Sequence, residues 1–224
     1  MSFTINNITS DSLGIIAEEE EFLARAAQRV EKLDLSGVDG SSYTELGYLD
    51  IEQSMNLQIL DLTKLDSILA LFNKTVTLGF SGRKTIARFF SELQPSRIAS
   101  IKSIPVTFIR SPFWYLESET DQVITSSSAT IINNGTVETF PLLKVTGTGT
   151  VTVTLNDVSF EYTFDTSYVY VDCMPGPERK AYFGSVKKNR NKNGGWPSLA
   201  VGNNSLTFSG NVTEIVVTKR TRYL

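Results

Sequence analysis

The pattern of hydrophobic and polar residues changes at Pro105 to Leu116, PVTFIRSPFWYL. Helical and extended patterns alternate before this stretch, whereas short alternating runs separated by turns follow it. Pro112 lacks an N–H donor and biases the preceding residue towards extended backbone, so a strand should end or bend there. The aromatic triplet Phe113, Trp114 and Tyr115 must bury a large apolar area, either at a domain seam or at a subunit contact. We therefore predict a domain seam here, between an N-terminal domain of residues 1–118 and a C-terminal domain of residues 119–224.

The N-terminal part contains one strongly amphipathic helix among strands. Alternation over Phe3 to Ile8 predicts a first strand that ends at the turn Thr9-Ser10-Asp11. Asp61 to Phe72 is predicted to be a helix, started by Asp61 or Thr63 and ended by Asn73. Its apolar stripe consists of Leu62, Leu65, Ile68, Leu69 and Phe72. Strands are expected again at 75–80, 85–93 and 98–110, which together make an α+β domain.

The segment from Glu18 to Lys32 fits two structures. Its alanines and the i,i+4 pair of Glu21 and Arg25 favour a helix. The glycine-rich turn at residues 36–40 and the extended pattern of residues 46–57 instead favour a long hairpin. The residue pattern leaves both alternatives open.

The C-terminal part reads as an all-β domain. Turn residues recur at short intervals, and Val151, Val153 and Leu155 face away from the threonines between them. Cys173 lies on an apolar strand face and is expected to be a buried small hydrophobic residue. Many short strands with one polar face predict a β-sandwich or jelly roll.

The composition removes most catalytic chemistries. The chain has one cysteine and no histidine, so an internal disulfide, a Ser-His-Asp triad and a Cys-based metal cluster are excluded. The glycines form no P-loop or dinucleotide fingerprint. The four consecutive acids Glu18, Glu19, Glu20 and Glu21 favour a solvated acidic face over a metal or carboxylate site. We predict no enzyme activity, no metal and no cofactor.

No apolar run is long enough to cross a membrane, and no signal sequence opens the chain, so we expect a protein made in a cytoplasm.

Charge is distributed unevenly along the chain. The net charge is -3, with 11 basic and 15 acidic residues in 1–118 against 10 and 9 in 119–224. A run without acids follows Glu178 and is interleaved with aromatic residues, a combination that binds phosphates or stacks on bases. The alternative is an ordinary solvated loop with no binding role. The candidate contact residues are Arg179, Lys180, Lys187, Lys188, Arg190, Lys192 and Trp196, and Trp196 with Tyr168 or Tyr170 could form a sugar-stacking platform.

Several motifs, in order, resemble one family. They are RVEKLDLSGVDG before a glycine turn, SPFWY after a strand, VTGTGTVTVTLND, the Asn- and Lys-rich loop before WPSLAVGNN, and SGNVT leading into a basic last strand. Together the chain resembles the distal tail proteins (Dit) of long-tailed siphophages over its whole length. The acidic residues 18–21 and the Ala24 to Ala27 stretch depart from that pattern.

The resemblance implies a fold and a role. It implies a ring-forming α+β N-terminal domain and a galectin-like β-sandwich, in a hexameric ring at the distal end of the phage tail. The expected partners are further copies of the chain, the tail tube protein, the tail-associated protein and receptor-binding proteins, with DNA passing through the lumen. On this view residues 18–32 belong to the long hairpin that embraces the neighbouring subunit. Glu18 to Glu21, Arg25, Arg29 and Asp39 are then the candidate interface or lumen residues, and Phe113 and Trp114 pack at the domain junction.

An acidic lumen would repel DNA in transit, whereas a basic wall would bind it. The galectin sugar site needs a histidine that this chain lacks. Two other functions stay open: a carbohydrate-binding sandwich for cell-surface attachment, and a nucleic-acid-binding module that uses the basic run.

Overall fold

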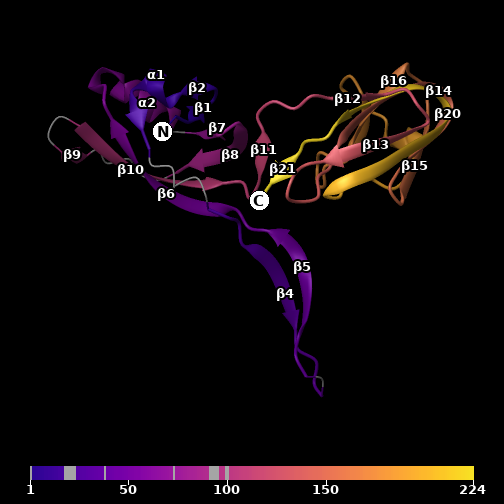
Figure 1. Cartoon of the computed structure of the whole chain (residues 1–224), viewed down its shortest axis with the longest axis horizontal. Coiled ribbons are helices and arrows are strands. Elements are labelled where there is room, and N and C mark those ends of the chain that lie inside the picture. Colours follow the sequence, from indigo (N-terminus) through magenta and orange to yellow (C-terminus); the bar gives the residue numbers. More distant parts are fainter. Residues whose placement is uncertain (1, 18–23, 38, 73, 91–95, 99–100) are drawn as a thin grey trace. The chain divides into compact units, whose positions relative to one another are not determined.

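The computed structural model describes residues 2–17, 24–37, 39–72, 74–90, 96–98 and 101–224 (Figure 1). The chain divides into two compact units, unit 1 with residues 1–117 and the terminal Leu224, and unit 2 with Ser118–Tyr223. Each unit has a hydrophobic core of its own.

Unit 1 is built on one antiparallel sheet in the order β2-β1-β7-β8-β10-β6-β3, with β9 beside β10 and β11 beside β8. Its longest pairing joins β10 to β6, from Lys102 opposite Ile59 to Arg110 opposite Ile51. The strands are β1 Thr4–Ile5, β2 Ile8–Thr9, β3 Ile15–Ile16, β6 Ile51–Ile59, β7 Thr75–Phe80, β8 Arg83–Phe89, β9 Ser96–Ile98, β10 Ile101–Arg110 and β11 Trp114–Leu116.

The chain start differs from the expected single strand. Asn6 and Asn7 have positive φ angles and form a tight turn between β1 and β2, because asparagine tolerates the left-handed region. The predicted turn at residues 9–11 is instead the start of helix α1, Ser10–Leu13, whose Ser12 N–H donates to the Thr9 hydroxyl. The prediction of a turn there was therefore wrong.

The predicted helix at residues 61–72 is present but shorter. A 3-10 turn, η2 Leu62–Lys64, leads into α2 Leu65–Leu71, and the Asp61 carboxylate accepts from the Thr63 N–H at 3.0 Å. Ile68 and Phe72 are buried, and the Phe72 ring lies 4.5 Å from that of Phe89 on β8. Leu62 is exposed, so the apolar stripe begins later than expected. Asn73 lies outside the described residues.

The ambiguous segment forms a hairpin where the structure describes it. Strand β4, Gln28–Leu33, pairs with β5, Ser42–Tyr48, and a bulge shifts the register between Gln28 and Val30. The helical alternative was wrong for these residues, because pairing with β5 outweighs the intrinsic helix propensity. Residues 18–23 lie outside the described part of the chain.

Unit 2 is a curled antiparallel sheet in the order β12-β20-β14-β16-β17-β18, with β13 beside β20, β15 beside β14 and β19 beside β15. Its elements are β12 Gln122–Ile124, β13 Ser128–Asn133, β14 Leu142–Leu155, β15 Val158–Thr163, β16 Tyr168–Asp172, β17 Lys180–Phe183, β18 Val186–Lys187, η3 Asn189–Asn191, β19 Lys192–Gly194, β20 Gly202–Thr218 and β21 Arg222–Tyr223. The register of β14 against β20 shifts at Gly147. A side chain at Gly147 would clash with the Asn211 carbonyl oxygen, so the two backbones approach closely only because this residue is glycine.

One apolar cluster fills unit 2, with Val145, Val153 and Val171 among its fully buried members. Cys173 belongs to this cluster, as predicted, and burial raises the pKa of its thiol to about 12. The predicted dominance of antiparallel β structure is confirmed. The galectin-like arrangement stays a prediction.

An ion pair fixes the chain just after β20, the last long strand of unit 2. Arg220 donates two hydrogen bonds to Asp172, at 2.7 and 2.8 Å. Burial alone would raise the pKa of Asp172, but hydrogen bonds from Arg220 and from the Met174 N–H, with the charge of Arg220, hold it below its ordinary value. Arg220 has a φ of 57°, so the pair also holds a strained residue in place.

Arg110, at the end of β10, is a buried cation whose hydrogen-bond acceptors among the described residues are neutral. It is 1% exposed and donates to Gln53 Oε1 at 3.3 Å, to the Ser111 carbonyl at 3.2 Å and to the Ala24 carbonyl. Its guanidinium lies 5.1 Å from the centre of the Trp114 ring. Burial lowers its pKa to about 10. Arg110 therefore ties the chain just before the hairpin to the sheet.

We predict that Arg110→Met destabilises unit 1 by about 2 kcal/mol, because buried acceptors lose their donor. Urea unfolding of the full chain measures the change. The matched control is Lys74→Met, which removes an exposed cation ahead of β7 and should change the free energy of unfolding by less than about 0.5 kcal/mol. Equal effects of the two changes would show that Arg110 does not anchor this region.

Candidate functional site

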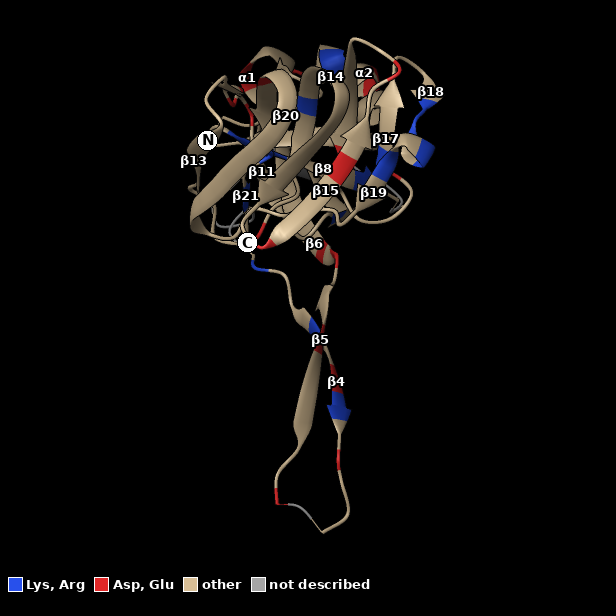
Figure 2. Ribbon diagram, turned by 90° about the vertical axis from the view of Figure 1, so that its right-hand side faces the viewer, with Lys and Arg blue, Asp and Glu red and all other residues tan. Residues whose placement is uncertain are grey.

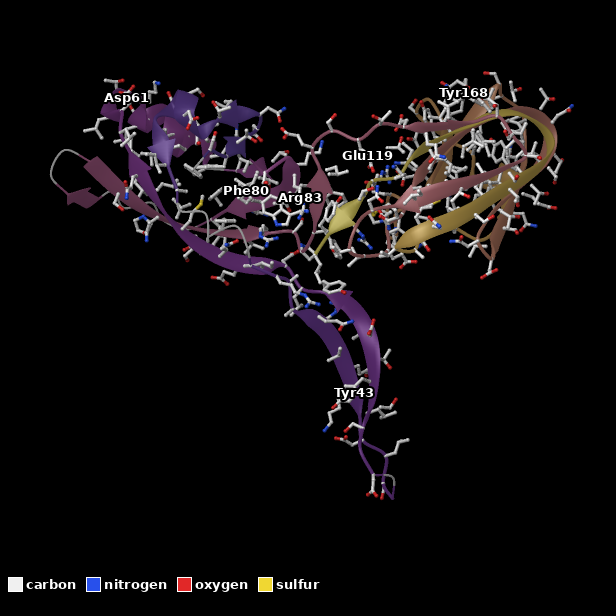
Figure 3. The ribbon with its side chains drawn as sticks, viewed as in Figure 1. Tyr43, Asp61, Phe80, Arg83, Glu119 and Tyr168 are labelled. Carbon is white, nitrogen blue, oxygen red and sulfur yellow. The ribbon has the colours of Figure 1, made fainter. Side chains whose placement is uncertain are left out.

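The hairpin of unit 1, which we call the arm (residues 28–48), exposes large apolar side chains along its length. Relative exposures run from 44% to 61%, although each side chain is large enough to favour burial. Figure 3 shows Tyr43 projecting from β5. The residues are Val30, Leu33, Leu35, Tyr43 and Leu46.

Both faces of the arm carry such residues. Because side chains alternate along a strand, Val30 shares a face with Glu45 and with Tyr43, whereas Leu33 and Leu46 lie on the other face. Strands β4 and β5 form a two-stranded sheet of their own. An isolated two-stranded hairpin is marginally stable in water, so the arm has the properties of a segment that is buried by another molecule.

The predicted interface residues that are described lie on the arm or just before it. Arg25 is exposed ahead of β4, and Asp39 is exposed in the turn. Arg29 Nη2 donates to the Leu46 carbonyl at 2.8 Å, so it braces the two strands. Glu18, Glu19, Glu20 and Glu21 lie outside the described residues. Contact of these residues with a neighbour stays a prediction.

The aromatic triplet after β10 packs within unit 1. Trp114 is 7% exposed, with its ring 6.3 Å from Phe80 and beneath the Arg110 guanidinium. Phe113 meets the Tyr48 ring edge to face at 5.3 Å. Tyr115 pairs with Lys84 of β8. Phe113 therefore supports the arm's root at Tyr48, a contact that the sequence did not reveal because the two residues are far apart in the chain. The seam assignment stays a prediction.

The basic run of unit 2 separates into two groups. Lys188 pairs with Asp165 at 2.6 Å, and Lys180 pairs with Glu178 at 3.4 Å. The exposed cations make no ion pair with any described residue, and Figure 2 shows basic positions at β17, β18 and β19. They are Arg179, Lys187 and Arg190. Three of the six predicted cations therefore have charge to offer a partner.

The Lys192 ammonium makes contacts within unit 2. Its Nζ lies 3.9 Å from the centre of the Trp196 ring and 4.9 Å from that of Phe160, and it donates to the Gly195 carbonyl. Burial lowers the pKa of Lys192 to about 8. Lys192 and Trp196 therefore contact each other within unit 2.

The predicted sugar-stacking platform is not assembled, because its rings already have partners. Trp196 carries the Lys192 ammonium on one face. The rings of Tyr170 and Tyr182 stack on each other at 5.2 Å, and Tyr168 has the Lys144 ammonium at 5.0 Å. Sugar rings bind to a free aromatic face, so this arrangement weakens the carbohydrate-binding alternative.

Among the described residues, no group of three acidic or cysteine side chains could hold a metal ion. In the same part of the chain, no helix is long and apolar enough to cross a membrane. Large exposed apolar side chains, as on the arm, and exposed cations, as on unit 2, are features of surfaces that contact other macromolecules.

Solved structures provide the comparison. The chain matches the Dit protein of phage SPP1, described as a paradigm of the hub adsorption apparatus in phages that infect Gram-positive bacteria, with a TM-score of 0.73. This match has 14% identity and covers 100% of this chain and 99% of that one. A chain of the phage P2 baseplate in its activated conformation matches with a TM-score of 0.50 and 10% identity, covering 96% and 97%. No protein-family model matches the sequence, and no curated protein matches it either.

The chain has the fold of phage Dit and baseplate hub proteins. The resemblance inferred from the sequence motifs is confirmed at this level.

We predict that Lys192 loses its proton near pH 8 and that Trp196 fluorescence follows this titration. Because the folded pKa lies below the ordinary 10.5, the unfolded chain binds more protons between about pH 8 and 10.5, and folding stability rises with pH across that window. Trp114→Phe removes the only other tryptophan, so emission reports Trp196 alone.

In the Trp114→Phe background, Lys192→Met should abolish the fluorescence step near pH 8. A step that keeps its midpoint without Lys192, or that occurs only above pH 10, would contradict the assignment.

Proposed function

We propose that this protein is a non-enzymatic structural component of a phage tail tip, where it forms a ring that joins the tail tube to the baseplate. The match in fold to the SPP1 Dit protein, over 100% of this chain, is the observation that carries the proposal. A match of this extent includes both units, so it does not rest on one common domain type.

In this proposal unit 1 forms the ring and the arm embraces the neighbouring copy. The exposed apolar residues of the arm support this, because they gain free energy only when another surface covers them. Six copies are proposed to close the ring. Arg25 and Asp39, with Glu18 to Glu21, belong to the interface or to a lumen through which DNA passes. An acidic lumen would keep DNA from binding to the wall.

Unit 2 is proposed to be a galectin-like domain on the outside of the ring, with Phe113, Trp114 and Tyr115 at the junction of the two domains. The unpaired cations Arg179, Lys187 and Arg190 are offered to acidic surfaces of tail-associated or receptor-binding proteins. This role in host attachment needs no sugar site on the chain itself. The proposed location of the protein is the tail tip of the virion, after assembly in the host cytoplasm.

The purified full-length chain should form rings of six copies in negative-stain images, with a native mass of six times 24.8 kDa. Because ring closure depends on concentration, images and masses are collected over a wide concentration series. Binding of the same purified chain to a glycan array and to single-stranded DNA is measured alongside. A chain that stays monomeric at all concentrations and binds glycans would contradict the proposal and favour the carbohydrate-binding alternative.

A further inference from the structure

Strand β8 of unit 1 exposes two large apolar side chains on the face of the sheet opposite its buried residues. Its alternate residues Thr85, Ala87 and Phe89 are buried on the side that Phe72 covers. On the opposite side Ile86 is 56% exposed and Phe90, directly after the strand, is 53% exposed. Sheets that face water on one side normally carry polar residues there, so two large apolar side chains on one short strand indicate a covered surface.

The same face is basic. Arg88 lies between Ile86 and Phe90 and makes no ion pair with the described residues. In the neighbouring strand β10, Ile109 lies opposite Arg88 and is 37% exposed. We call the set Ile86, Arg88, Phe90 and Ile109 the β8 patch. It combines a cation with apolar residues on either side.

One face of the arm has the complementary pattern. Tyr43, 61% exposed, and Val30, 47% exposed, lie beside Glu45, which makes no ion pair with the described residues. Lys32, opposite Tyr43, is neutralised by Asp34 at 3.0 Å. This face therefore offers an anion with apolar residues on either side.

Net charge agrees with this pairing. Residues 28–48 contain two basic and four acidic residues, whereas residues 83–90 contain three basic residues and no acidic one. Complementary charge at an interface orients the partners and rejects wrong registers. Within one chain the arm is held at its root by the Leu49 N–H on the Ala27 carbonyl and by Phe113 against Tyr48. The residues of the β8 patch stay exposed there, so a second chain must supply the arm.

We propose that the β8 patch is the docking surface for the arm of a neighbouring copy, with Tyr43 and Val30 on its apolar residues and Glu45 paired with Arg88. This inference rests on the proposed self-assembly and specifies which two surfaces meet. The other arm face, with Glu31 and Leu33, is not the one that docks on β8.

A charge exchange tests the pairing. Glu45→Arg and Arg88→Glu alone should each raise the concentration of half-assembly at least about tenfold, since each places like charges together. The double variant should restore assembly to within about threefold of the wild type. Glu31→Arg, on the opposite face of the same arm, is the matched control. It should not raise the concentration of half-assembly comparably, and Arg88→Glu should not rescue any effect that it has. Sedimentation velocity of the full chain gives the oligomer, and circular dichroism verifies folding.

A cysteine pair tests the contact directly and does not depend on charge. Chains with Tyr43→Cys, mixed with chains with Ile86→Cys, should form a disulfide between copies under mild oxidation, because that bond needs Cβ atoms about 4 Å apart. The native Cys173 is buried and does not compete. Leu46→Cys, on the other face of the arm, is the control and should give no cross-link with Ile86→Cys.

The outcomes separate the two proposals. Rings that form without rescue by the double variant, or that cross-link through Leu46→Cys, overturn the docking surface and leave the ring intact. Cross-linked oligomers that are not rings of six support the docking surface and contradict the proposed ring. A chain that neither assembles nor cross-links contradicts both.

Discussion

The main physical constraint on this structure is that the arm exposes apolar surface that the chain itself does not bury. The arm holds large side chains on both of its faces, and its two strands form a sheet only with each other. At about 25 cal/mol per Å² of apolar area, covering these side chains would contribute favourable free energy. In our proposal, assembly follows from how unit 1 folds, and the basic β8 patch gives the arm a complementary surface on another copy.

The rest of unit 1 fixes the root of the arm. Arg110 joins Gln53 of β6 to the Ala24 carbonyl before the arm, and Phe113 packs on Tyr48 at the arm's last residue. An arm fixed at its root loses less conformational entropy on binding than a free one. Unit 2 needs no such partner to complete its core, and half of its basic run is already used in internal contacts.

Sequence patterns predicted the strand-rich fold, the capped helix at Asp61 and the burial of Cys173, because these depend on local periodicity. The motif order also identified the fold that the comparisons confirm. The Asn6-Asn7 turn was missed, since its signal is only two residues long. The arm's strands were ambiguous because helix propensity and strand pairing compete there. Arg110 and the occupied ring of Trp196 could not be predicted, as each depends on neighbours distant in sequence.

Removal of the arm tests the central claim most directly. A variant in which an Asn-Gly turn replaces residues 30–45 keeps every strand of the main sheet, because β4 and β5 pair with none of them. The native mass of this variant shows whether assembly needs the arm. It is measured over the same concentration range as that of the full chain. The account predicts a folded monomer that unfolds at the same midpoint as the full chain diluted to its monomeric state. Rings that still form without the arm would contradict it.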